Sequence, residues 1–125
     1  MPKDVVTTDQ IAPPVGPFSA AVRAGGFLFL SGQVGVDPRT DKLVDGDAAA
    51  QAEQVLTNVS AVLLASGKSL ADVVRVGVFL TDMADYAAVN AVYRRHFPEP
   101  FPARTAVCVA ALPLGAKVEI DLIAH

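Results

Sequence analysis

The chain has 125 residues, about the length of one domain, and we expect a single domain over residues 1–125. Hydrophobic residues make up 52% of the chain and charged residues 18%, which excludes a disordered protein, because disordered chains are charge-rich and poor in apolar residues. The net charge of −3 argues against a nucleic-acid-binding surface, which is normally basic.

The first third of the chain predicts short strands joined by turns. Residues 4–17 begin as an extended piece and continue as a loop, because the prolines at its end are incompatible with a helix or a sheet ladder. Two strands with a turn at Gly25-Gly26 between them, an extended continuation and a proline-containing turn follow at residues 18–24, 26–31, 32–36 and 37–40.

A long helix is predicted over residues 47–66, where apolar residues recur at intervals of three and four. Asp45 or Asp47 can cap its start, and Gly67 ends it. Residues 72–81 predict a strand with two largely apolar faces, as in a central strand that is covered on both sides.

A second helix is predicted over residues 83–96, capped by Asp82 or Asp85, and a proline-rich loop follows it. Its apolar stripe consists of Tyr86, Val89, Tyr93 and Phe97. Two final strands, 104–110 and 117–124, complete the order β-β-β-α-β-α-β-β, which indicates an α+β layer of sheet and helices.

The last two strands each carry a charged residue opposite an apolar face, Arg104 in the first and Glu119 in the second. We therefore expect both side chains to point to the sheet face that the helices leave uncovered. Two interpretations stay open. The pair could form a cross-strand ion pair, or Arg104 could bind a substrate carboxylate while Glu119 holds or activates a water molecule.

Other residues offer weaker signals. One cysteine and two histidines form no metal-binding cluster, so we expect no metal site. We expect Cys108 to be a packed hydrophobic residue, His96 to interact with a helix dipole, and the hydroxyl of Ser31 either to face a site or to cap a turn. His125, the last residue, is expected to be solvated.

The composition also predicts location and association. A lone cysteine fits a reducing compartment, and residues 1–4 lack the features of a signal peptide. No run of 18 apolar residues occurs, so we expect a cytoplasmic protein without membrane contact. The shortage of charged residues for so small a chain predicts that part of its surface is buried in an oligomer.

The sequence resembles the RidA/YjgF family of enamine and imine deaminases, also known as endoribonuclease L-PSP-like proteins, over residues 8–124. The motifs that carry the resemblance are Ile11-Ala12-Pro13, Val15-Gly16-Pro17-Phe18-Ser19, Phe29-Leu30-Ser31-Gly32-Gln33, Gly35-Val36-Asp37-Pro38, Gln51-Ala52, Asn58-Val59, Val89-Asn90-Ala91-Val92-Tyr93, Phe101-Pro102-Ala103-Arg104-Thr105, Leu112-Pro113 and Val118-Glu119-Ile120. Their order along nearly the whole chain makes the resemblance specific.

The resemblance implies a chorismate-mutase-like (bacillus chorismate mutase-like) fold of the α+β class. In this fold two helices pack on a six-stranded mixed sheet, and three subunits form a homotrimer around a central barrel, with sites between subunits. The implied activity is hydrolysis of 2-iminopropanoate and 2-iminobutanoate to 2-oxo acids and ammonia. The resemblance implies no metal and no organic cofactor.

By position, the resemblance implies that Arg104 binds the substrate carboxylate and that Glu119 positions water. The implied substrate-binding residues are Phe18, Ser31, Gly32, Asn90, Arg104 and Ala106. Phe18 stands where the family has a tyrosine, and Ala106 stands where it often has a cysteine. Two alternatives remain: a trimer that binds small ligands or acts as a chaperone without turnover, and an endoribonuclease or translation inhibitor.

Overall fold

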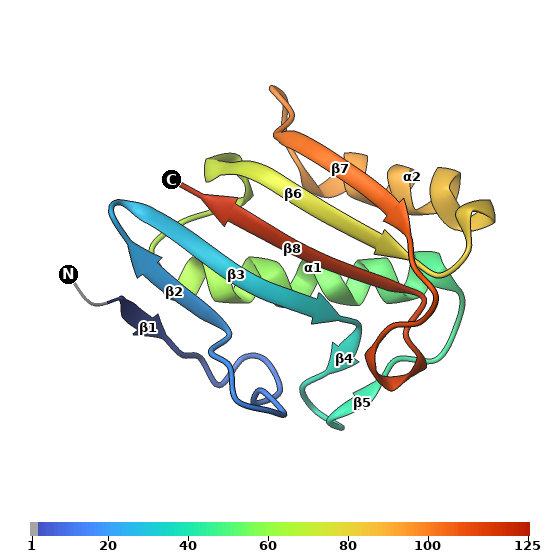
Figure 1. Cartoon of the computed structure of the whole chain (residues 1–125), viewed down its shortest axis with the longest axis horizontal. Coiled ribbons are helices and arrows are strands. Elements are labelled where there is room, and N and C mark those ends of the chain that lie inside the picture. Colours follow the sequence, from blue (N-terminus) through green and yellow to red (C-terminus); the bar gives the residue numbers. More distant parts are fainter. Residues whose placement is uncertain (1–2) are drawn as a thin grey trace.

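Two helices lie on one face of a six-stranded sheet in the computed structural model, which describes residues 3–125 (Figure 1). In chain order the elements are β1 Asp4–Val6, β2 Ala21–Ala24, β3 Phe27–Val34, β4 Val36–Asp37, β5 Lys42–Leu43, α1 Ala48–Ala65, β6 Val73–Leu80, α2 Tyr86–His96, β7 Ala103–Cys108 and β8 Val118–Ala124. The strands are ordered β1-β2-β3-β8-β6-β7, and only the β6–β7 pair is parallel. This mixed α+β arrangement confirms the predicted fold class.

Glycines and a capping aspartate set the boundaries of two elements. The β2–β3 hairpin turns at Gly25 and Gly26, whose positive φ angles of 58° and 83° favour residues without a side chain. Asp47 caps the start of helix α1, because its carboxylate accepts a hydrogen bond from the Ala50 amide at 2.9 Å. Asp47, and not Asp45, is therefore the cap.

The core forms between α1 and the sheet. One side of α1 is fully buried, including Val55, Leu56, Val59, Val62 and Leu63. These side chains pack against alternate residues of the two central strands β3 and β8, which are also buried. Within residues 3–125, no helix has both the length and the hydropathy that crossing a membrane requires.

The strand β6 is covered on one face only. Val76 and Val78 are buried against the helices, whereas Val74 on the other face is 45% exposed. The expectation of a strand covered on both sides is therefore not met within one chain, because α1 and α2 lie on the same side of the sheet. Phe29 and Val107 are also exposed on this open face.

The strand expected at residues 18–24 begins only at Ala21, and the first three residues of the second expected helix form a short 3-10 helix, Met83–Asp85, ahead of α2. Two further features differ from the sequence-based expectation. The turn after residue 36 is the tip of a small hairpin, in which β4 pairs with β5. The strand β7 ends at Cys108, two residues earlier than expected. Both differences concern edges, where pairing depends on neighbouring segments more than on the local pattern.

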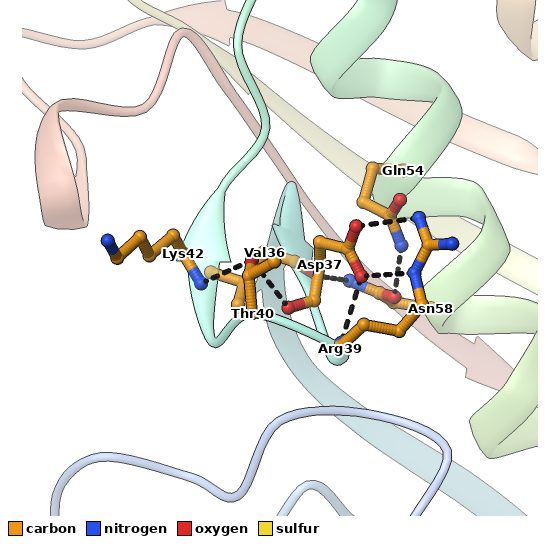
Figure 2. Close-up of polar contacts among 7 residues, drawn as sticks. All are labelled: Val36, Asp37, Arg39, Thr40, Lys42, Gln54 and Asn58. Carbon is orange, nitrogen blue, oxygen red and sulfur yellow. Dashed lines mark hydrogen bonds and ion pairs between the residues drawn. The ribbon is translucent and has the colours of Figure 1, made fainter.

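A network of buried amides joins α1 to this small hairpin (Figure 2). The Asn58 side chain, which is 2% exposed, donates a hydrogen bond to the Val36 carbonyl at 2.9 Å and accepts one from Gln54. Gln51, about two turns of α1 before Asn58, accepts a hydrogen bond from the Lys117 amide at 2.8 Å. These contacts fix β4 and the start of β8 relative to the helix.

Replacing the helix cap tests this account of α1. Asp47→Ala should lower the free energy of unfolding by about 1 kcal/mol, because the Ala50 amide loses its acceptor. Asp45→Ala is the matched control, since no described residue donates a hydrogen bond to Asp45, and it should change the stability little. Urea unfolding of both variants at one protein concentration gives the comparison. Equal losses in the two variants would contradict the assignment.

Candidate active site

Arg104 points to the face of the sheet that carries the helices. It lies opposite Val76 in the parallel β6–β7 pair, and its guanidinium carbon is 4.7 Å from the centre of the Tyr93 ring and 5.7 Å from that of Tyr86. One terminal nitrogen donates a hydrogen bond to the Tyr86 hydroxyl at 3.1 Å. The expectation that Arg104 faces the uncovered side is therefore wrong. An arginine can lie on a partly apolar face because its stem and flat head pack against aromatic rings.

A hollow of about 320 Å³ opens around this arginine. Its lining residues come from α2, β7 and the loop between them, namely Tyr86, Asn90, Tyr93, Arg94, Phe101, Pro102 and Arg104. The lining contains two cations and no carboxylate. Among residues 3–125, no aspartate or glutamate forms an ion pair with Arg104. The hollow is thus suited to an anionic group, and we call it the arginine hollow.

Glu119 lies on the opposite face of the sheet. Its neighbours along β8, Val118 and Ile120, are buried toward α1, so alternation turns Glu119 outward. The β3–β8 register shifts between Leu30 and Gln33, which places an irregularity at Ser31 and Gly32. There the Glu119 carboxylate lies directly against Gly32. A side chain at position 32 would overlap this carboxylate, so only glycine leaves room for it.

A larger hollow of about 570 Å³ includes Glu119, and we call it the glutamate hollow. Most of its lining is apolar, and it consists of Ala12, Pro14, Val15, Phe18, Ser31, Gly32, Gln33, Val34, Val36, Pro113, Leu114 and Glu119. Ser31 donates its hydroxyl proton to the Ser19 carbonyl at 2.6 Å, which leaves the oxygen lone pairs as acceptors. Phe18 is 49% exposed and forms an open aromatic wall.

The surroundings of Glu119 favour its protonated form. Partial burial, and then the negative charge of Asp121 on the same strand, raise the pKa of the Glu119 carboxyl above its usual value. A carboxyl group with a raised pKa is better matched to proton transfer near neutral pH than an ordinary surface glutamate. Glu119 can therefore serve as a proton acceptor and donor in the glutamate hollow.

One chain does not bring the expected site residues together. Arg104 and Asn90 line the arginine hollow, whereas Phe18, Ser31, Gly32 and Glu119 line the glutamate hollow on the other side of the sheet. A cross-strand ion pair between Arg104 and Glu119 is thereby excluded within the chain. Ala106 shares the face of Arg104 but packs against the core and lines neither hollow.

Three minor expectations can be compared with the structure. Cys108 is exposed and not packed in the core of the chain. His96 lies in the last turn of α2, the helix end where a dipole contact is expected, and its Nε2 atom also lies 2.8 Å from the Glu53 carboxylate. His125 is exposed, with its ring centre 4.7 Å from that of Phe27. The described residues contain no cluster of three metal-ligating side chains.

The sequence reasoning missed two aromatic contacts of Arg104. It placed Tyr86 and Tyr93 on the apolar stripe of a helix and treated them as core residues. The spacing held a further signal, because positions 86, 90 and 93 share one side of a helix and therefore group Asn90 with both tyrosines. The arginines and loop residues of the hollow carry no comparable local pattern.

Comparison with known proteins gives consistent matches along the whole chain. The family model described as Endoribonuclease L-PSP matches residues 8–125. A RutC family protein of Pyrococcus horikoshii is 47% identical over 98% of both chains. A 2-iminobutanoate/2-iminopropanoate deaminase of Dermatophagoides farinae is 43% identical over 98% of this chain and 95% of its own. The crystal structure of RidA from an Antarctic Psychrobacter superposes with a TM-score of 0.94, at 47% identity, over 98% of both chains.

The charge on Glu119 should cost stability at neutral pH. Because its folded-state pKa is raised, the folded chain is relatively more stable when Glu119 is protonated, and this advantage is lost as the pH rises through that pKa. Glu119→Gln should therefore be more stable than the wild type at pH 7, and the difference should disappear below about pH 4. Thermal or urea unfolding across this range measures it.

Glu99→Gln is the control for that experiment, since Glu99 lies exposed in the proline-rich loop and its replacement removes the same charge. A gain of equal size and pH dependence in Glu99→Gln would show that net charge, and not the surroundings of Glu119, is responsible.

Proposed function

Because the chain belongs to the endoribonuclease L-PSP family, which includes RidA proteins, we propose that it is a hydrolase of reactive 2-imino acids. The substrates are 2-iminopropanoate and 2-iminobutanoate, and the products are the 2-oxo acids and ammonia. The observation that carries the proposal is the half-buried Arg104, which has no carboxylate partner among residues 3–125. Deaminases named for these imines among the relatives support the same reaction.

In the proposed mechanism the protein mainly orients the substrate and a water molecule, because the imine is already reactive. Arg104 binds the substrate carboxylate through its fork of N–H donors. Glu119 holds a water molecule and takes its proton as the oxygen adds to the imine carbon, which is already electrophilic. The resulting carbinolamine receives that proton on nitrogen. Glu119, again ionised, takes the hydroxyl proton as the C=O bond forms and the C–N bond breaks, and that proton passes to the solvent as ammonia leaves. One water is consumed, and no redox partner is needed.

The remaining residues of the proposed site shape the space around the imine. Asn90 contributes an amide to the arginine hollow, and Ser31 offers a hydroxyl oxygen in the glutamate hollow. Gly32 leaves room for the Glu119 carboxylate, and Phe18 packs against the apolar side chain of the substrate. Ala106 acts through its backbone, because its side chain lines neither hollow.

We propose that the site closes between subunits of a homotrimer with a chorismate-mutase-like fold. The two hollows are different surfaces, so joining one to the other is a heterologous contact, which closes into a ring when the rotation permits. The open sheet face would line the central barrel, which covers apolar residues that one chain leaves exposed, such as Phe29, Val74 and Val107. Such burial also accounts for the low share of charged residues in the sequence.

Ammonia release from freshly generated 2-iminobutanoate tests the reaction. In Arg104→Ala the acceleration over the uncatalysed rate should be about 10–150 times smaller than in the wild type, because one charge-assisted hydrogen bond to the substrate is lost. Glu119→Gln should lose the proton transfer, which is worth about 100-fold or more. Arg39→Ala, at an exposed arginine paired with Asp37, is the matched control and should keep full activity. A folded wild-type oligomer that binds 2-oxobutanoate without accelerating hydrolysis would replace this proposal with a binding function.

Mixing two inactive variants tests the site between subunits. In a heterologous ring, an Arg104→Ala chain contributes an intact glutamate hollow, and a Glu119→Gln chain contributes an intact arginine hollow. Unfolding and refolding an equal mixture should restore about a quarter of the wild-type sites, since each site draws its two halves at random. Refolding each variant alone supplies the baseline. No recovery in the mixture would contradict a site shared between chains.

A further inference from the structure

The strongest unassigned feature is the way in which two tyrosines surround Arg104. An arginine side chain has many rotamers, and ordering it costs conformational entropy. Here the Tyr93 ring supports the guanidinium from one side at 4.7 Å, and the Tyr86 hydroxyl accepts one of its N–H groups at 3.1 Å. No other described residue accepts a hydrogen bond from the Arg104 side chain, so its remaining donors stay available to a ligand.

The two tyrosines differ in what their hydroxyl groups do. Tyr93 is 6% exposed, its ring stacks on Phe97 at 4.2 Å, and its hydroxyl has no hydrogen-bond partner among residues 3–125. Tyr86 is 38% exposed at the rim of the arginine hollow, and its hydroxyl contacts Arg104 directly. Tyr93 thus acts through its ring as part of the core, whereas the hydroxyl of Tyr86 acts on the guanidinium.

We propose that Tyr86 is a positioning residue whose neutral hydroxyl holds the Arg104 guanidinium in the orientation that receives a substrate carboxylate. This inference rests on the proposed function, in which Arg104 binds that carboxylate. The hydroxyl accepts a single hydrogen bond and carries no charge, so it orders the Arg104 guanidinium without competing with the substrate carboxylate for it. A carboxylate in the same place would form an ion pair with Arg104 and block the site.

The ionised form of Tyr86 should have the opposite effect. Asn90 and then the positive charge of Arg104 lower the pKa of the Tyr86 hydroxyl below its usual value. The other groups that line the hollow are Arg94, which is also a cation, and apolar or aromatic residues. A phenolate there would pair with Arg104 and compete with the substrate, so carboxylate binding should weaken at alkaline pH.

Binding of 2-oxobutanoate, the stable product, tests this inference without any turnover. Tyr86→Phe removes only the hydroxyl and should raise the Kd of 2-oxobutanoate about three- to tenfold near pH 7. This is less than the full value of a hydrogen bond to a charged group, because the contacts between Arg104 and the ligand remain. Near pH 10 the two Kd values should converge or reverse, because only the wild type can form a phenolate at position 86. Tyr93 is present in both proteins, and burial raises the pKa of its hydroxyl. A titration followed by NMR, with the Arg104 Nε–H signal as reporter, measures both the Kd and the order of the guanidinium.

Thr105→Val is the matched control. The Thr105 hydroxyl accepts a hydrogen bond from Arg75 at 3.0 Å, the same kind of contact on the open face of the sheet, and its loss should leave the Kd unchanged at both pH values. Equal Kd values for wild type and Tyr86→Phe, or a ratio that does not vary with pH, would overturn the inference. Binding that depends on Tyr86 in a protein that does not accelerate imine hydrolysis would overturn the deaminase proposal alone. A wild type that does not bind 2-oxobutanoate would overturn both.

Discussion

The packing of α1 against one face of the sheet is the constraint from which the rest of the molecule follows. Its fully buried side, with Val55, Val59 and Val62 at the centre, lies on the central strands β3 and β8. Because both helices lie on that side, a strand side chain points either to the helix-covered face or to the open face of the sheet. The alternation of side chains along each strand decides which face a given residue occupies. The same packing leaves apolar residues exposed on the open face, which a single chain of this size rarely does.

This one-sided covering also separates the two candidate half-sites. Glu119 follows a buried residue of β8 and therefore faces the open side, across Gly32. Arg104 lies opposite the buried Val76 and therefore faces the helix side, where α2 supplies its aromatic neighbours. A reaction that needs both groups requires a second chain, so the separation gives the proposed trimer a chemical role in addition to burial.

Buried amides connect the core to the glutamate hollow. Asn58 holds the Val36 carbonyl at one wall of the hollow, and Gln51 holds the Lys117 amide two residues before Glu119. A buried amide that lost these partners would leave unsatisfied polar groups, which costs roughly 1–3 kcal/mol each. The position of Glu119 is thus fixed by the helix as well as by the sheet.

The sequence by itself determined the chain order of the two helices and of the strands in the six-stranded sheet, the turn at Gly25-Gly26 and the α+β class, but not the β4–β5 hairpin. It also determined the family, which the comparisons confirmed. These depend on local signals, namely periodicity, caps, turn residues and motifs in order. Only the tertiary structure decided which face each charged residue occupies, the choice of Asp47 over Asp45, and the tyrosine support of Arg104. The physical reason is that the environment of a strand residue depends on which helix covers it and which strand lies beside it, and both contacts come from residues far away in the chain.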